Sequence, residues 1–70
     1  MEKKVLVTGF NGEIGSKIIK ELVSLDKQII AIDVNDSKGK IESVKYIKDS
    51  ILNYDLIKSI FENNRITEVY

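Results

Sequence analysis

The chain has 70 residues, of which 43% are hydrophobic and 31% charged, a composition typical of a folded globular protein rather than a disordered one. Its 11 basic and 11 acidic residues give a formal net charge of zero, which argues against nucleic acid or an anionic membrane as a partner. Because cysteine and histidine are both absent, we expect no thiol chemistry and no metal site. No apolar run approaches the ~20 residues that span a bilayer and no signal peptide precedes the first strand, so we expect a cytoplasmic protein.

The first half of the chain predicts a strand, a helix and a second strand. Residues 5–7 form a short apolar run that is typical of a strand covered on both faces of a parallel sheet. A helix of about three turns is expected next, because apolar residues recur there at helical spacing. Its predicted buried stripe consists of Ile14, Ile18, Leu22 and Leu25. Residues 28–33 are a second apolar run of strand length.

The second half begins with a polar stretch, residues 34–42, which is expected to be an exposed loop. Val44 and Tyr46 alternate with lysines in a third, more polar strand that we expect near an edge of the sheet. Asn53 is expected to cap a second helix, and the asparagines at 63 and 64 are expected to end it in the left-handed conformation. The predicted buried stripe of this helix consists of Leu56, Ile57, Ile60 and Phe61.

A fourth strand is expected over residues 66–70, so that strands alternate with helical crossovers. This order predicts a three-layer α/β fold whose parallel sheet has the strand order 3-2-1-4 and binds ligands at the carboxyl ends of its strands. Because the chain stops within the fourth strand, we expect residues 1–70 to be the N-terminal part of one truncated domain, with no complete second domain. The uncovered edge of the sheet favours association into a homo-oligomer.

Residues 8–15 read Thr-Gly-Phe-Asn-Gly-Glu-Ile-Gly, directly between the first strand and the first helix. In a dinucleotide-binding turn, Gly9 lets the chain leave the strand, Gly12 lets the backbone approach a pyrophosphate, and Gly15 lets the helix pack closely on the strand. The diphosphate then lies over the N–H groups of the helix N-terminus. A nucleoside triphosphate loop is disfavoured, because it requires Lys followed by Ser or Thr after its last glycine.

Asp33 ends the second strand, 24 residues after Gly9. The dinucleotide fingerprint places an acidic residue near this distance, where it accepts hydrogen bonds from the adenosine ribose. A carboxylate repels the 2′-phosphate of NADP, and Asp36 adds a further acid with no arginine nearby, so NAD is the expected cofactor of a Rossmann-type half-domain. Lys38 and Lys40 are interpreted as solvated loop residues rather than phosphate ligands. The alternative is an ordinary glycine turn and a strand-ending aspartate that bind nothing.

The glycine pattern together with Asp33 resembles the N-terminus of the extended short-chain dehydrogenase/reductase family. That family includes NAD-dependent nucleotide-sugar epimerases and dehydratases, and threonine dehydrogenases. The resemblance implies that Phe10 lines the turn. It also implies a diphosphate contact through the backbones of Asn11, Glu13 and Ile14.

An adenine contact is implied as well, because the family carries an aspartate and an aliphatic residue after the third strand. Here the sequence is Asp49-Ser50-Ile51, one residue out of step, so either Asp49 or Ser50 is the expected polar contact and Ile51 the apolar one. The alternative is that Asp49 and Ser50 simply end the strand.

The family's catalytic tyrosine, with a lysine four residues later, lies beyond the fourth strand. Tyr54 and Lys58 have this spacing but fall on the second predicted helix, where an exposed pair is the ordinary interpretation. We therefore expect no catalytic residue and no activity from these 70 residues alone. The resemblance implies an NAD-dependent epimerase, dehydratase or related dehydrogenase, with a nucleotide sugar as substrate of the full-length protein. The alternative is a non-catalytic dinucleotide sensor or regulator of the same fold.

Overall fold

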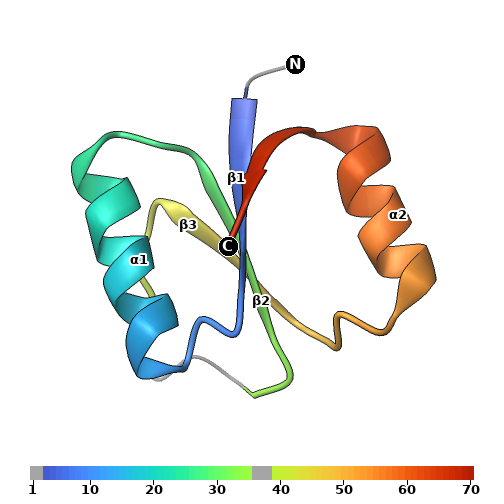
Figure 1. The fold of residues 1–70 in the computed structure, drawn as a ribbon, viewed down its shortest axis with the longest axis horizontal. Coiled ribbons are helices and arrows are strands. Elements are labelled where there is room, and N and C mark those ends of the chain that lie inside the picture. Colours follow the sequence, from blue (N-terminus) through green and yellow to red (C-terminus); the bar gives the residue numbers. More distant parts are fainter. Residues whose placement is uncertain (1–2, 36–38) are drawn as a thin grey trace.

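The computed structural model describes residues 3–35 and 39–70. It contains β1 (Lys3–Thr8), α1 (Glu13–Ser24), β2 (Ile29–Asp33), β3 (Val44–Lys48), α2 (Tyr54–Asn63) and β4 (Arg65–Val69). The strands form one parallel sheet in the order β3-β2-β1-β4, with α1 on one face and α2 on the other (Figure 1). The predicted three-layer α/β fold and its strand order are confirmed. Asp36 and Lys38, in the predicted loop, lie outside the described residues.

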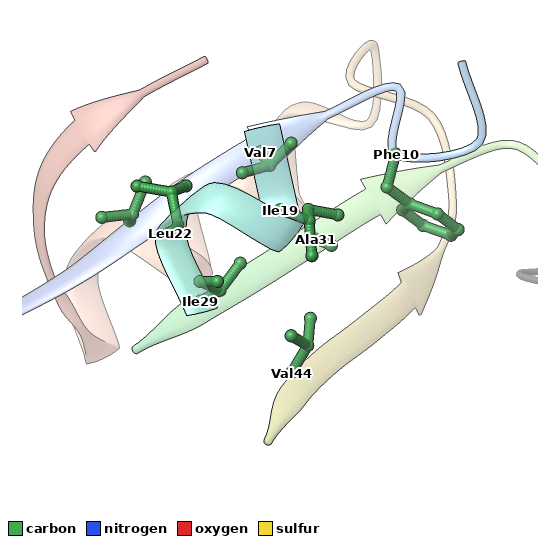
Figure 2. Packing of buried hydrophobic residues seen from close by; sticks show 8 residues of the cluster. Val7, Phe10, Ile19, Leu22, Ile29, Ala31 and Val44 are labelled. Carbon is green, nitrogen blue, oxygen red and sulfur yellow. The ribbon is translucent and has the colours of Figure 1, made fainter. Parts of the chain in front are cut away.

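The two central strands have apolar middles, residues 5–7 of β1 and 29–32 of β2, because each supplies side chains to both faces of the sheet. Toward α1, the side chains of Val7, Ile29 and Ala31 pack against Ile19 and Leu22 (Figure 2). On the α2 face, a second buried cluster contains Leu6, Ile30, Ile32 and Ile60. Strand β3 lies at one edge of the sheet, as predicted from its lysines.

Helix α1 buries a different stripe from the one predicted. Its buried residues are Gly15, Ile19 and Leu22, with Ile18 partly buried, whereas Ile14 is 75% exposed and Leu25 is also exposed. The prediction for Ile14 was wrong because the close approach of Gly15 to the preceding turn fixes the rotation of the helix, and the prediction for Leu25 was wrong because the helix ends one residue earlier, at Ser24. A shift of one residue turns a side chain about 100° around the helix axis.

Helix α2 begins as predicted, with the side chain of Asn53 accepting a hydrogen bond from the N–H of Leu56 at 3.2 Å. Ile60 is buried as expected, but Phe61 is 45% exposed and does not belong to the core. The helix ends at Asn63, yet Asn64 adopts an extended conformation rather than the predicted left-handed one. The reason is that β4 starts at the next residue, and the Asn64 side chain donates to the Ile60 carbonyl at 2.9 Å.

Within the described residues, neither helix has the length and apolar character that a bilayer crossing requires.

Candidate functional site

The turn after β1 and the end of β2 meet at the carboxyl edge of the sheet. Gly9 has a φ of +69°, in the left-handed region that a residue with a side chain rarely adopts. Its N–H donates to the Ile32 carbonyl at 2.9 Å, so the turn begins attached to the neighbouring strand. The chain then reverses, and the N–H of Gly12 donates to the Gly9 carbonyl at 3.1 Å. The turn is therefore compact and fixed at its start by its own backbone.

Gly15 permits the closest approach in this turn. A Cβ atom at Gly15 would collide with the Gly9 carbonyl oxygen and would lie 3.1 Å from the Gly9 carbonyl carbon. The predicted close packing of the helix at Gly15 is thus present, although the contact is with the turn rather than with β1 itself. By contrast, a Cβ at Gly12 would lie 3.4 Å from the Gly9 oxygen, so the fold itself leaves room for a Cβ there.

The N-terminus of α1 opens at this edge without a side-chain cap. Gly12 is the N-cap residue and makes no side-chain hydrogen bond to the helix. The first N–H groups of an α-helix have no acceptor within the helix, and the helix dipole favours an anion in front of them. Glu13 and Ile14 both follow in the first turn and are exposed. This end of α1 is consequently able to receive an anionic group.

Asp33 lies beside the glycine turn and accepts hydrogen bonds from two backbone N–H groups. Its Oδ1 accepts from Asn35 at 2.9 Å, and its Oδ2 accepts from Asn11 at 3.1 Å. The N–H of Asn35 is the main cause of a lowered pKa for the Asp33 carboxyl. Desolvation is the next-largest effect and raises this pKa, while the N–H groups of Asn11 and Val34 lower it by smaller amounts. Asp33 is therefore a carboxylate at neutral pH. Each oxygen keeps lone pairs for further donors.

A pocket of about 280 Å³ joins the ends of β1, β2 and β3 at this edge. It brings Gly9, Asp33 and the segment 49–51, all of them predicted site residues, together from three distant parts of the sequence. The residues that line it are Thr8, Gly9, Ile32, Asp33, Val34, Asp49, Ser50 and Ile51. The remaining predicted residues do not line it, because they belong to the turn and to the start of α1 (Asn11, Gly12, Glu13, Ile14 and Gly15).

Asp49 and Ser50 make local hydrogen bonds at the start of the segment that leads to α2. The Asp49 carboxylate accepts from the Ser50 N–H at 2.7 Å and from the Asn53 side-chain amide at 3.1 Å. The Ser50 hydroxyl oxygen accepts from the Leu52 N–H at 3.0 Å, and its own proton is available to a ligand as a donor. Ile51 is 58% exposed and offers an apolar surface to the pocket.

Sequence reasoning did not predict Thr8, Ile32 and Val34 as residues that line this pocket, nor the contact from Asn35. Thr8 lines the pocket, and its N–H and hydroxyl both donate to the Tyr70 carbonyl, at 2.8 and 2.9 Å. Asn35 supplies an N–H to the Asp33 carboxylate. The contact from Asn35 to Asp33 was predictable from the sequence, because an aspartate commonly accepts from the N–H two residues later. The contacts of Thr8 with Tyr70 were not, since they depend on the pairing of β1 with β4.

Tyr54 and Lys58 lie on α2, as the sequence predicted, and both are exposed. Tyr54 is the first residue of the helix, is 72% exposed and is not among the residues that line the pocket. The exposure agrees with an ordinary surface pair.

A parallel sheet in this order, with a tight glycine turn before the first helix, defines a Rossmann-type α/β protein. The model of the family described as "NAD dependent epimerase/dehydratase family" matches residues 5–70. The chain belongs to this family, so the family expected from the sequence is confirmed, and NAD as the expected cofactor agrees with the family's stated dependence.

Individual relatives agree with this assignment. The chain is 35% identical to a UDP-glucose 4-epimerase of Haemophilus influenzae and 33% identical to one of Pasteurella multocida, with 93% of this chain covered in each case. It spans only 22% of the length of either enzyme.

Solved structures show the same likeness. A UDP-glucose 4-epimerase of Thermotoga maritima, solved with UDP-glucose, superimposes with a TM-score of 0.78. The two chains are 30% identical over 97% of this chain and 23% of that one. A short chain dehydrogenase of Leptospira borgpetersenii, solved with bound NAD+, gives a TM-score of 0.72 at 29% identity over 90% of this chain and 26% of that one.

Proposed function

We propose that the carboxyl edge of the sheet binds the ADP half of NAD, in an NAD-dependent enzyme that acts on a nucleotide sugar. The observation that carries this proposal is the shared pocket beside the uncapped end of α1. It combines the strand-ending acid Asp33 with Gly9 and with the segment of Asp49, Ser50 and Ile51. Family membership supports NAD as the dinucleotide.

The diphosphate is assigned to the turn and the first residues of α1. Gly12 has no side chain to fill the space in front of the helix, and the fold itself does not require a glycine there. Gly9 and Gly15 give the turn its shape. The backbone N–H groups of Glu13 and Ile14 complete the proposed contact, because free N–H groups at a helix N-terminus bind phosphate oxygens. The N–H of Asn11, the third residue expected to contact the diphosphate, donates to Asp33 Oδ2 instead. The remaining contacts on the ligand are assigned to the pocket.

The adenosine is assigned to the pocket at the ends of β2 and β3. Asp33 would accept hydrogen bonds from the ribose hydroxyls through lone pairs that its two backbone donors leave available. Ile51 would pack against the adenine ring, with Ser50 and Asp49 as the polar groups at its rim. Asp49 already binds Asn53 and the Ser50 N–H, so its carboxylate also holds this rim in place.

When bound, NAD supplies a nicotinamide that accepts a hydride from a carbon bearing a hydroxyl group. The residues of this chain would bind and orient the other half of the cofactor, and we assign no catalytic group to them. A nucleotide sugar is the proposed substrate because related enzymes are named UDP-glucose 4-epimerase. Dehydration of a nucleotide sugar is the second reaction within the same family.

Calorimetric titration of the full-length protein tests the binding proposal. NAD and ADP should both bind, and ADP should compete with NAD, because the proposed contacts are all to the ADP half. Nicotinamide mononucleotide should not compete at the same concentration. Absence of NAD binding would contradict the proposal.

An activity assay tests the proposed chemistry separately. The full-length protein with NAD is incubated with UDP-glucose, and the products are analysed for UDP-galactose and for dehydrated sugar. Formation of either product supports the enzyme. A protein that binds NAD but converts no nucleotide sugar would instead be a dinucleotide sensor of this fold.

A further inference from the structure

Asn11 connects the glycine turn to the segment that follows β2. Its backbone N–H donates to Asp33 Oδ2 at 3.1 Å, and its side-chain amide donates to the carbonyl oxygen of Asn35, also at 3.1 Å. The N–H of Asn35 donates to the other carboxylate oxygen, Asp33 Oδ1, at 2.9 Å. These three residues therefore form a closed ring of hydrogen bonds around one carboxylate.

The ring holds the two oxygens of Asp33 from two different parts of the chain. One donor belongs to the turn between β1 and α1, and the other belongs to the residues just after β2. The Asn11 side chain is the third connection, and it fixes the distance between these two donors. A rotation of the carboxylate would break at least one N–H bond. Such preorganisation keeps a ligand-binding group in a single orientation before the ligand arrives.

We infer that Asn11 is a positioning residue whose side chain locks the Asp33 carboxylate against the ribose, so that the site accepts a free 2′-hydroxyl and rejects a 2′-phosphate. This inference rests on the proposed function. A carboxylate that turns away would relieve its repulsion from a phosphate at little cost. A carboxylate held by the ring must instead face that phosphate or lose its backbone partners.

The variant Asn11→Leu tests this role in the full-length protein. Leucine has the same branched arrangement of side-chain heavy atoms as asparagine and retains the backbone N–H, but it cannot donate to the Asn35 carbonyl. The matched control is Asn63→Leu, because the exposed Asn63 side chain makes its hydrogen bond to Ser59 on α2. The affinities for NAD and NADP are measured by calorimetry for each protein, and thermal unfolding shows that each variant is folded.

In Asn11→Leu we expect NAD affinity to fall roughly 3- to 10-fold, the effect of one net hydrogen bond. NADP affinity should fall less or rise, so the NAD/NADP ratio decreases. Asn63→Leu should change neither value. An unchanged ratio in a folded Asn11→Leu protein would overturn the inference, even if both affinities fell equally, because only the diphosphate turn would then be disturbed. Failure of the unmodified protein to bind NAD would overturn the proposed function instead.

Discussion

The fold requires two of the three glycines in the turn, Gly9 and Gly15, but not Gly12. Gly9 provides a positive φ, and Gly15 provides space for backbone contact with Gly9. Gly12 lies in an extended conformation that any residue adopts, with no atom closer to its hypothetical Cβ than 3.4 Å. The fold therefore gives no reason for a glycine at position 12. A ligand in front of the helix does give one.

We therefore predict that Gly12→Val retains the fold but weakens NAD binding by roughly tenfold or more, because its side chain occupies the proposed diphosphate position. Calorimetric titration measures the loss, and circular dichroism checks the fold. Gly39→Val is a suitable control, since a Cβ at Gly39 meets nothing within 4 Å and the residue is not part of the turn. Unchanged NAD affinity in folded Gly12→Val would show that the diphosphate lies elsewhere.

Asp33 is the residue that we expect to determine the preference for NAD over NADP. Asp33→Ala removes a charged acceptor, and the loss of such a hydrogen bond corresponds to about 1.5–3 kcal/mol. NAD affinity should fall by roughly tenfold or more, whereas NADP should be rejected less strongly. Paired titrations with the two cofactors measure the ratio. The exposed acid Glu62, on α2, offers the control Glu62→Ala. The same ratio in Asp33→Ala and in the unmodified protein would contradict the ribose assignment.

At the scale of elements, α1 ends in a left-handed turn although no glycine directly follows it in the sequence. The N–H of Asp26 donates to the Val23 carbonyl at 3.0 Å, and the N–H of Lys27 donates to the Leu22 carbonyl at 3.0 Å. This is the Schellman arrangement, which usually has glycine in the left-handed position. Here that position is Asp26, with a φ of +59°. The chain thus turns from α1 toward β2 through a residue under mild backbone strain.

Asp26→Gly should relieve this strain and raise the free energy of unfolding by roughly 0.5–1 kcal/mol. Denaturant unfolding of the full-length protein gives the value. The control is Asp55→Gly, which places glycine in the first turn of α2 and removes an acid that favours the helix dipole, and it should lower stability by roughly 0.5–1 kcal/mol. A destabilised Asp26→Gly variant would mean that the aspartate side chain contributes more than its backbone strain costs.

At the scale of the whole molecule, two separate clusters hold the three layers together. The larger cluster lies between the sheet and α1, and the smaller one lies between the sheet and α2. Helix α2 contributes a single buried side chain, that of Ile60, with Leu56 and Ile57 partly buried beside it. Attachment of α2 to the sheet therefore depends strongly on Ile60.

We predict that Ile60→Ala lowers the free energy of unfolding by about 2–4 kcal/mol, through lost burial and the cavity that remains. The neighbouring exposed residue supplies the control Lys58→Ala, which should stay within about 0.5 kcal/mol of the unmodified protein. Urea unfolding measures both. Equal stability of the two variants would show that Ile60 is not an anchor of α2.

The pattern of residues predicted the strands, helices and strand order because apolar runs and helical spacing are local properties of the sequence. It failed for Ile14, Leu25 and Phe61, which are exposed. Helical spacing shows that an apolar stripe exists, but the rotation of a helix is set by its contacts with the sheet. The left-handed end predicted at Asn64 is also absent, because β4 begins at the next residue and requires an extended backbone there.

The sequence by itself determined the fold, the family and the glycine turn, since spacing along the chain carries that information. Only the tertiary structure placed Asp33 within reach of the Asn11 N–H and opened one pocket to both Asp33 and Ile51. These contacts join residues that are far apart in the chain, and they form because parallel strands bring their carboxyl ends to one edge. The hydrogen-bond ring around Asp33 depends on that convergence, which no local pattern encodes.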